Sequence, residues 1–182
     1  RQAAFAAEAA FVQIDESIAK DFDYETGHQR YAGNTGEVMA QFRTSAVQAQ
    51  AHYDALQRVV DDYASPEWAT AAIARQGSLY DSLRSALYDV RAPALQMFDK
   101  KTEALLTRAE NSDSPELQEQ ADAVRMRVET AWRDARDREL DSADQVMVDR
   151  YGNAITLARR YNVSNPAIMK AIQRMAFFTD VI

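Results

Sequence analysis

Between Pro115 and Tyr161 the sequence holds no further proline and a single glycine, Gly152. Small and aliphatic residues recur in this range every three or four positions, which is the spacing of one helical face. Either one helix of about 47 residues spans the range, or two helices meet near residues 139–142, where the register of the apolar residues falters. We favour one helix, roughly 70 Å long at 1.5 Å per residue, and leave open whether it bends at that point.

The remaining segments show the same spacing over shorter lengths, and no segment alternates strictly between apolar and polar residues as a half-buried strand does. Hydrophobic residues make up 47% of the chain, and only five glycines and four prolines are available for turns. We therefore predict one all-α domain over residues 1–182, built from antiparallel helical hairpins. Besides 115–161, the predicted helices cover about residues 4–22, 38–63, 65–92, 94–110 and 168–178, and the glycine-containing stretch 23–36 is predicted to be a loop.

Two short stretches of the chain are nearly identical, namely SPEW at residues 65–68 and SPEL at residues 114–117. A serine side chain can accept a hydrogen bond from a first-turn amide, proline suits the first helical position, and glutamate is favoured at the positive end of a helix. We interpret both stretches as helix starts, and an Asn–Pro pair as a third. The predicted caps are Ser65 with Pro66, Ser114 with Pro115, and Asn165 with Pro166.

The helix that follows Ser65 carries apolar residues on two sides, which is typical of a helix packed between neighbours. One side begins at Trp68, and the other includes Ile73 and Tyr80. Gly77 lies between them, although glycine costs about 1 kcal/mol relative to alanine inside a helix. We therefore expect a neighbouring helix to approach closely at Gly77.

The stretch WATAAIARQGSLY, residues 68–80, resembles helix A of a tetratricopeptide repeat (TPR). Gly77 and Tyr80 match its small residue and the aromatic residue three positions later, Ile73 matches its large residue, and Trp68 begins the stretch. The predicted caps lie 49 and 51 residues apart, whereas a TPR array repeats every 34 residues or so. The chain thus resembles a degenerate TPR-like superhelix with one or two very long helices, and no peptide-clamp residue of the family can be matched here.

Residues 51–83 and 155–172 also resemble segments of large bacterial TPR proteins of the myxobacterial kind, some of which belong to envelope-associated motility machinery. The resemblance implies a C-terminal fragment of a larger repeat protein, located in the periplasm or at the cell envelope. It further implies a scaffold that binds other proteins or peptides in the concave surface between its helices.

The sequence shows no recognisable catalytic constellation. It has no cysteine and two histidines, His28 in the predicted loop and His52 on a helix. No Glu-x-x-His pair, nucleophile elbow or phosphate-binding loop occurs. Glu8, Asp15 and Glu16 share part of one helix surface but lack a histidine partner. We predict no catalytic residue, no cofactor and no metal, and interpret His28 as solvated and His52 as a helix-flank residue.

The charge of the chain limits its partners. The net charge is −7 and no basic stripe occurs, whereas nucleic-acid binding depends on lysines and arginines that neutralise phosphates. No stretch reaches the roughly 20 apolar residues that span a bilayer. We therefore expect partners that are proteins or peptides, without nucleic acid and without a membrane span.

The densest run of charges is RMRVETAWRDARDREL, residues 125–140. Its i,i+4 pairs of opposite charge are typical of a solvated helix face. Arginine and tryptophan are also enriched at protein interfaces, so Trp132, Arg133 and Arg136 are the candidate partner-binding residues. Trp132 would be a binding hot spot if exposed, but we favour its burial under the helix 94–110. That helix is also expected to bury Leu95, Phe98, Leu105 and Leu106.

Three functions fit these observations. We favour a non-enzymatic protein-interaction scaffold. The alternative is a helical bundle that binds a small molecule or a metal, which a cavity lined by aromatic residues would favour. The third is a structural spacer, in which the helix 115–161 sets a distance.

Overall fold

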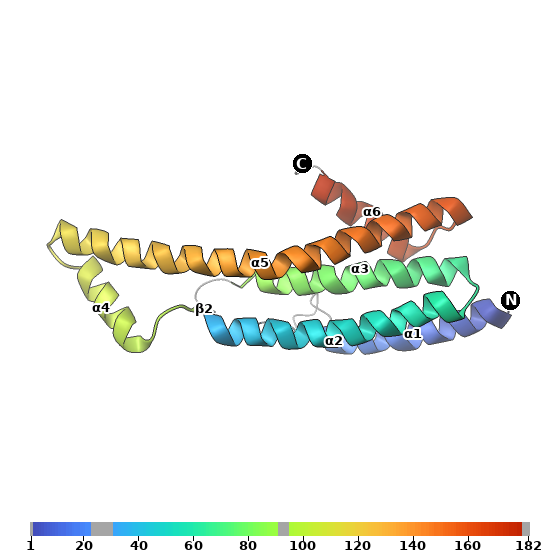
Figure 1. The fold of residues 1–182 in the computed structure, drawn as a ribbon, viewed down its shortest axis with the longest axis horizontal. Helices are drawn as coiled ribbons and strands as arrows, with labels where there is room; N and C mark the ends of the chain where they lie inside the picture. Colours follow the sequence, from blue (N-terminus) through green and yellow to red (C-terminus); the bar gives the residue numbers. More distant parts are fainter. Residues whose placement is uncertain (1, 23–30, 91–94, 180–182) are drawn as a thin grey trace.

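The computed structural model describes residues 2–22, 31–90 and 95–179. Nearly all of these residues are helical, so the all-α prediction is confirmed (Figure 1). His28 and most of the predicted loop lie outside the described residues. The helices are α1 (Gln2–Phe22), α2 (Thr35–Asp62), α3 (Pro66–Tyr88), α4 (Lys100–Glu110), α5 (Pro115–Tyr161) and α6 (Pro166–Thr179), and the two short strands are β1 (Gly33–Asn34) and β2 (Leu95–Gln96).

Helix α3 is the central element of the fold. It packs between α2 and α5, and α1 and α6 contact it at further positions. The chain reverses direction between α1 and α2, between α2 and α3, and between α3 and α5, so these long helices lie side by side along the long axis (Figure 1). Helix α4 packs mainly against the first half of α5, away from this bundle.

The range 115–161 forms a single helix, α5, of 47 residues, as we favoured. Gly152 does not interrupt it, and a side chain at that position would meet no neighbour within 4 Å. The helix ends at Asn162, which adopts a left-handed conformation with φ 52° and ψ 45°. The N–H of Val163 then donates to the carbonyl of Ala158 at 2.9 Å, a bond typical of a Schellman helix end. Asparagine tolerates the left-handed conformation, so Asn162 ends α5 at a defined position.

The close approach predicted at Gly77 is present. A Cβ atom on Gly77 would lie 2.7 Å from Cδ1 of Tyr151, whose ring belongs to α5. That distance is too short for non-bonded carbon atoms, which prefer about 3.5–4.0 Å. Glycine at residue 77 therefore lets α5 approach α3, and the prediction that α3 is packed on two sides is confirmed.

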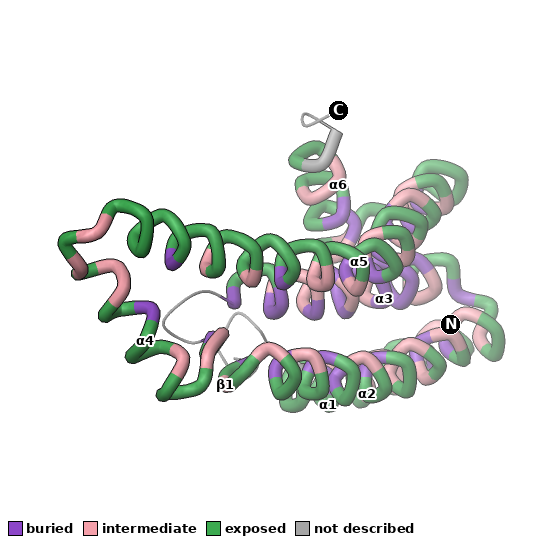
Figure 2. Tube along the Cα trace, turned by 60° about the vertical axis from the view of Figure 1, so that its left-hand side comes forward, coloured by how far each residue is buried: buried purple, intermediate pink, exposed green. Residues whose placement is uncertain are grey.

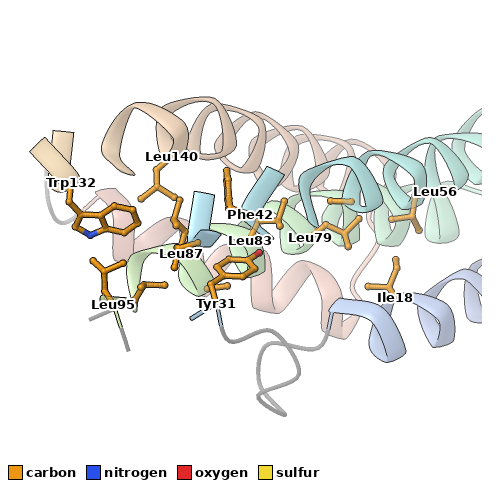
Figure 3. Close-up of a cluster of buried hydrophobic side chains, with 14 of the residues drawn as sticks. Ile18, Tyr31, Phe42, Leu56, Leu79, Leu83, Leu87, Leu95, Trp132 and Leu140 are labelled. Atoms are coloured by element: carbon orange, nitrogen blue, oxygen red, sulfur yellow. The ribbon is translucent and has the colours of Figure 1, made fainter. Parts of the chain in front are cut away.

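The main core lies between α1, α2, α3 and the middle of α5 (Figure 3). Leu79, Leu83 and Leu87 extend along it on successive turns of α3. Each buried aliphatic side chain contributes roughly 1.5–3 kcal/mol, so this row of leucines supplies much of the stability. A second, smaller cluster surrounds Met147 and Tyr151, where α3, α5 and α6 meet.

The structure contains a short parallel strand pair that the sequence pattern did not predict. Gly33–Asn34 (β1), just before α2, pairs with Leu95–Gln96 (β2), in the connection between α3 and α4. Asn34 is also the N-cap of α2, because its side chain accepts the N–H of Glu37 at 2.9 Å while the Glu37 carboxylate accepts the N–H of Asn34 at 2.8 Å. This capping box gives residues 34–37 a defined conformation at the start of α2, where the sequence had predicted a loop up to residue 36.

The predicted helix 94–110 is wrong at its start, because α4 begins only at Lys100. The cause is Asp99, whose carboxylate accepts the N–H groups of Lys101 and Thr102 at 2.9 and 2.8 Å and so caps the helix. Helix α4 packs mainly against α5, and it therefore has a single covered face. Of the four residues expected to be buried, Leu95 is buried in β2, Leu106 is buried in α4, Phe98 is half-buried, and Leu105 is 59% exposed, contrary to prediction.

The predicted caps lie at helix starts, but they do not share one set of contacts. Ser65 and Ser114 are the N-cap residues of α3 and α5, each followed by a proline in the first turn. Neither serine side chain accepts a first-turn amide, so that part of the prediction is wrong. Their ψ angles of 101° and 112° differ from the 169° of Asn34, whose side chain does reach such an amide. Asn165 behaves as predicted, because its Oδ1 accepts the N–H three residues later at 3.0 Å.

Candidate functional site

We use the term arm for α4 together with residues 115–135 of α5. The arm extends past the end of α3 (Figure 1). Figure 2 shows that most of the arm is exposed, whereas buried residues are closely spaced along the rest of α5. In the bundle α5 is covered by α3, but α3 does not extend along the arm. A hollow lies between the arm, the end of α3 and residues 95–98, which we call the β2 connection.

The arm hollow has a volume of about 620 Å³, within the range of roughly 300–1,000 Å³ typical of ligand sites. Its apolar residues come from the end of α3, the β2 connection and α5, and its charged residues come from α5. The lining residues are Tyr88, Val90, Leu95, Met97, Phe98, Arg125, Glu129, Trp132, Arg133 and Arg136.

The hollow exposes one face of α5. Residues 125, 129, 132 and 136 are spaced by four, three and four positions, which places them on the same side of a helix. Trp132 is only 5% exposed and belongs to the same core cluster as Leu95 and Leu140 (Figure 3). The favoured burial of Trp132 is thus confirmed, although its cover comes from β2 and not from α4. The alternative of a fully exposed hot spot is wrong.

The indole N–H of Trp132 has no hydrogen-bond acceptor among the residues that the structure describes. The indole nitrogen is not one of the side-chain atoms that are both buried and unpaired, so this donor keeps contact with solvent although the ring packs in the core. Trp132 lines the hollow, so an occupant of the hollow can supply the acceptor. A tryptophan whose ring is fixed in the core and whose donor is unused is suited to ligand binding.

Arg125 holds the two helices of the arm together. Its Nη1 and Nη2 donate to the two carboxylate oxygens of Glu103 at 3.2 and 2.7 Å, and its Nε donates to Glu110. The guanidinium also lies 5.5 Å from the ring centroid of Phe98. These hydrogen bonds from Arg125 lower the pKa of the Glu103 carboxyl below its usual value. Its internal hydrogen bonds therefore hold Arg125 in place at one side of the hollow.

Arg133 and Arg136 differ in accessibility, because their side chains are 59% and 17% exposed. Arg133 is paired with Glu129 one turn away, and both side chains are about half exposed. Arg136 lies over the ring of Tyr88 with its guanidinium 4.9 Å from the ring centroid, and it also pairs with Asp137 at 2.8 Å. An exposed pair such as Arg133 with Glu129 contributes only about 0–1 kcal/mol. A ligand carboxylate can therefore replace Glu129 as the partner of Arg133 at small cost.

The structure brings together all three residues that the sequence singled out, since Trp132, Arg133 and Arg136 line the same hollow. Sequence reasoning missed Arg125, although its position seven residues before Trp132 places it on the same helical face. It also missed Tyr88 as a lining residue. No local pattern marks Tyr88, because its approach to the arm depends on the packing of α3 against α5.

The four residues of the TPR-like stretch do not converge on one site. Ile73 and Gly77 are buried against α5, whereas Tyr80 is half-buried and donates to Gln50 at 3.0 Å. Trp68 contacts Phe11, with ring centroids 5.3 Å apart. In this structure the four residues pack helices together in different places.

A second hollow of about 550 Å³ lies between α1, α3 and α6, with part of α5 at its base. Phe11 and Trp68 line one part of it, and Ala71 and Ala74 are among its small residues. Arg75 crosses to α1, where its Nε donates to Asp15 at 2.5 Å. The walls of this hollow carry charges of both signs, whereas three of the four ionic residues at the arm hollow are arginines.

A buried polar cluster near the second hollow fastens α6 to the bundle. Arg174 donates to both carboxylate oxygens of Asp81 at 2.5 and 2.6 Å, and Tyr151 Oη donates to the same carboxylate at 3.4 Å. Burial, followed by the Asp81 charge, raises the pKa of Tyr151 above its usual range. Tyr151 is therefore a neutral hydrogen-bond donor across the physiological range.

Within the described ranges no cluster of three or more histidine, cysteine or acidic residues is placed to bind a metal ion. His52 Nε2 lies 3.2 Å from Asp21 Oδ2, in a helix-to-helix contact. Among the same residues, no helix combines the length and the apolar character needed to cross a bilayer. No protein-family model, no curated protein and no solved structure matches this chain.

Proposed function

We propose that this chain is a non-enzymatic protein-interaction scaffold, built on TPR-like helical repeats, that binds a segment of another protein in the arm hollow. The observation that carries the proposal is the arm hollow itself, which joins an apolar floor that includes Trp132 to a rim with three arginines. Residues that dominate binding energy are typically aromatic residues and arginines in such well-packed surroundings.

The TPR-like part of the proposal is supported by the stretch 68–80 and by the way α3 packs between two long neighbours. Long helices that pack in succession form extended grooves, which repeat proteins use to bind partners. The arm hollow lies where this succession ends, because α5 continues beyond α3. A partner segment there would cover a face of α5 that the chain itself leaves open.

Photo-cross-linking tests this proposal. The chain would carry benzoylphenylalanine in place of Met97, which lines the hollow, and be incubated with an extract of the cells that express it. Met126 provides the matched control, since it lies on the arm, is 68% exposed and does not line the hollow. We expect a discrete protein adduct at position 97 that is lost in an Arg133→Glu background and absent at position 126. Equal labelling at both positions would contradict the proposal.

A second candidate function, the binding of a small molecule, is favoured by the hollow between α1, α3 and α6. There Phe11 and Trp68 offer aromatic surface, and Arg75 and Lys170 are the cations of the lining. The same experiment separates the two functions, because Met97 lines only the arm hollow of these two. A small ligand in the second hollow would leave the cross-linking pattern at position 97 unchanged.

A further inference from the structure

We infer that the segment bound in the arm hollow is an acidic peptide that buries one apolar side chain, an inference that rests on the proposed function. The chemistry of the lining carries it. The apolar residues, the unpaired indole N–H and the arginines occupy three different parts of one hollow, and each requires a different feature of the ligand.

The arginines require carboxylates. The chain as a whole has a net charge of −7, yet three arginines and one glutamate line the hollow. A guanidinium presents a planar set of donors that matches a carboxylate, often through two parallel hydrogen bonds. Arg125 is already held by two glutamates and the Arg136 side chain is only 17% exposed, so Arg133 is the arginine that a ligand carboxylate reaches most readily.

The floor of the hollow requires an apolar side chain. Leu95, Met97 and Phe98 come from the β2 connection and face the hollow together with Trp132. An apolar residue placed against them gains roughly 25 cal/mol for each Å² removed from water. Neither an inorganic anion nor a peptide of acidic residues alone would remove this apolar surface from water.

The indole N–H of Trp132 requires a hydrogen-bond acceptor within the hollow. A peptide backbone offers a carbonyl oxygen at every residue, so a peptide can reach Trp132 while its neighbouring side chains contact the rim. One segment can thus fulfil all three requirements at once.

The surroundings of the hollow argue against a long polyanion. Glu103, Glu110 and Glu129 lie beside the arginines of the hollow. A nucleic acid bound across these arginines would bring its phosphates close to the three carboxylates, and like charges repel. A short acidic segment whose charges end at the rim avoids this repulsion.

The test uses three synthetic nine-residue peptides, each with a central phenylalanine that is flanked by glutamates, by glutamines or by lysines. Binding is followed in the Trp68→Phe protein, which retains Trp132 as its single tryptophan. We expect the glutamate peptide to bind most tightly and to shift the NMR signal of the Trp132 indole N–H. Its affinity should also fall with added salt, because screening weakens exposed charge pairs.

Charge variants of the protein complete the test. In Arg133→Gln, and in the double variant with Arg136→Gln, we expect affinity for the glutamate peptide to fall roughly tenfold or more, a loss of about 1.4 kcal/mol. Arg159→Gln with Arg160→Gln is the matched control, since both arginines are exposed at the far end of α5. Because Arg133 is 59% exposed, its single variant remains informative should the Arg136 variant lose helicity.

The outcomes separate the two claims. Equal binding of the glutamine and glutamate peptides at Trp132 overturns the acidic specificity but leaves the scaffold proposal standing. A Trp132 signal that no peptide moves, or that responds instead to a DNA duplex, overturns the inference. The scaffold proposal has its own test in the cross-link at position 97, which does not depend on the charge of the partner.

Discussion

The two halves of α5 differ sharply in what covers them, although they belong to one helix. In residues 140–161 a buried residue recurs every three or four positions, and most of these residues face α3. In residues 115–139 the buried residues are Ala121 and Trp132. Both halves have a high content of helix-forming residues, so intrinsic propensity does not explain the difference. The presence of α3 beside one half and its absence beside the other does.

The comparison shows that a helix can be continuous along its length although its two halves are packed to different extents. An isolated helix is marginal in water, and most helical stability in proteins comes from packing of an apolar face. The bundle half has that packing, whereas the arm depends on α4, on Arg125 with its two glutamates and on a few apolar contacts. Regions with few buried contacts open more readily, and they also keep a face free for a partner.

The largest expected effect is the loss of Tyr151, which would test the bundle half. Tyr151 is 1% exposed and fills the space above Gly77. Truncation of a buried aromatic residue to alanine typically costs about 3–5 kcal/mol, so we expect Tyr151→Ala to lower the free energy of unfolding by roughly that amount. Urea denaturation followed by circular dichroism measures it.

The matching change in the arm is Met126→Ala, at a residue that is 68% exposed. Surface substitutions usually change stability by less than about 0.5 kcal/mol, and we expect Met126→Ala to do the same. Similar losses for the two variants would show that the arm and the bundle are equally well packed, and the contrast between the halves of α5 would then be wrong.

A smaller effect is expected from the charge pairs, which again differ between the regions. Asp81 and Arg174 have side chains that are 10% and 32% exposed, and Asp81 also accepts from Tyr151. Breaking a fully buried pair costs about 3–5 kcal/mol. Since Arg174 keeps partial access to water, we expect about 2 kcal/mol for Asp81→Ala.

The arm counterpart is Arg133 with Glu129, a pair exposed on the helix surface. Pairs at this spacing contribute about 0.3–0.5 kcal/mol. A double-mutant cycle at each pair measures the two coupling energies directly. A coupling energy for Arg133 with Glu129 as large as that for Asp81 with Arg174 would refute the proposed difference in burial.

A structural feature of this molecule could be predicted when the residues that cause it lie close together in the sequence. The 47-residue helix, the close approach at Gly77 and the burial of α3 on two sides all follow from local spacing, and each is confirmed. The start of α4 follows from one residue, Asp99, whose capping role competes with the apolar pattern around it. Apolar spacing alone therefore placed the start of that helix too early.

The candidate site was predictable in part for the same reason. Trp132, Arg133 and Arg136 lie within one short run, and their composition marked them as interface residues. The residues opposite them, Tyr88 and Leu95, come from the end of α3 and from the β2 connection. Their positions depend on the β1–β2 pairing and on where α3 ends, which are tertiary features without a local signature.

The smallest expected effect concerns pH and is confined to the arm. Hydrogen bonds from Arg125 hold the pKa of Glu103 below its usual value, and hydrogen bonds from Thr102 do the same for Asp99 at the start of α4. Because these carboxyl groups have a lower pKa in the folded arm than in the unfolded chain, the stability they contribute is complete above the unfolded values of about 3.9–4.3. It is lost as the pH falls through the folded values.

We therefore expect α4 to open at acidic pH before the bundle half of α5 responds. NMR titration of the Glu103 side chain, with amide exchange in α4 and α5, measures both steps. In Arg125→Gln the Glu103 pKa should return toward its ordinary value, while the Asp99 pKa, which depends on the amide and hydroxyl of Thr102 and on the amide of Lys101, stays low. A Glu103 pKa that is unchanged in this variant would mean that Arg125 does not join the two helices of the arm. The arm would then rely on its apolar contacts alone, and acid would not distinguish it from the bundle.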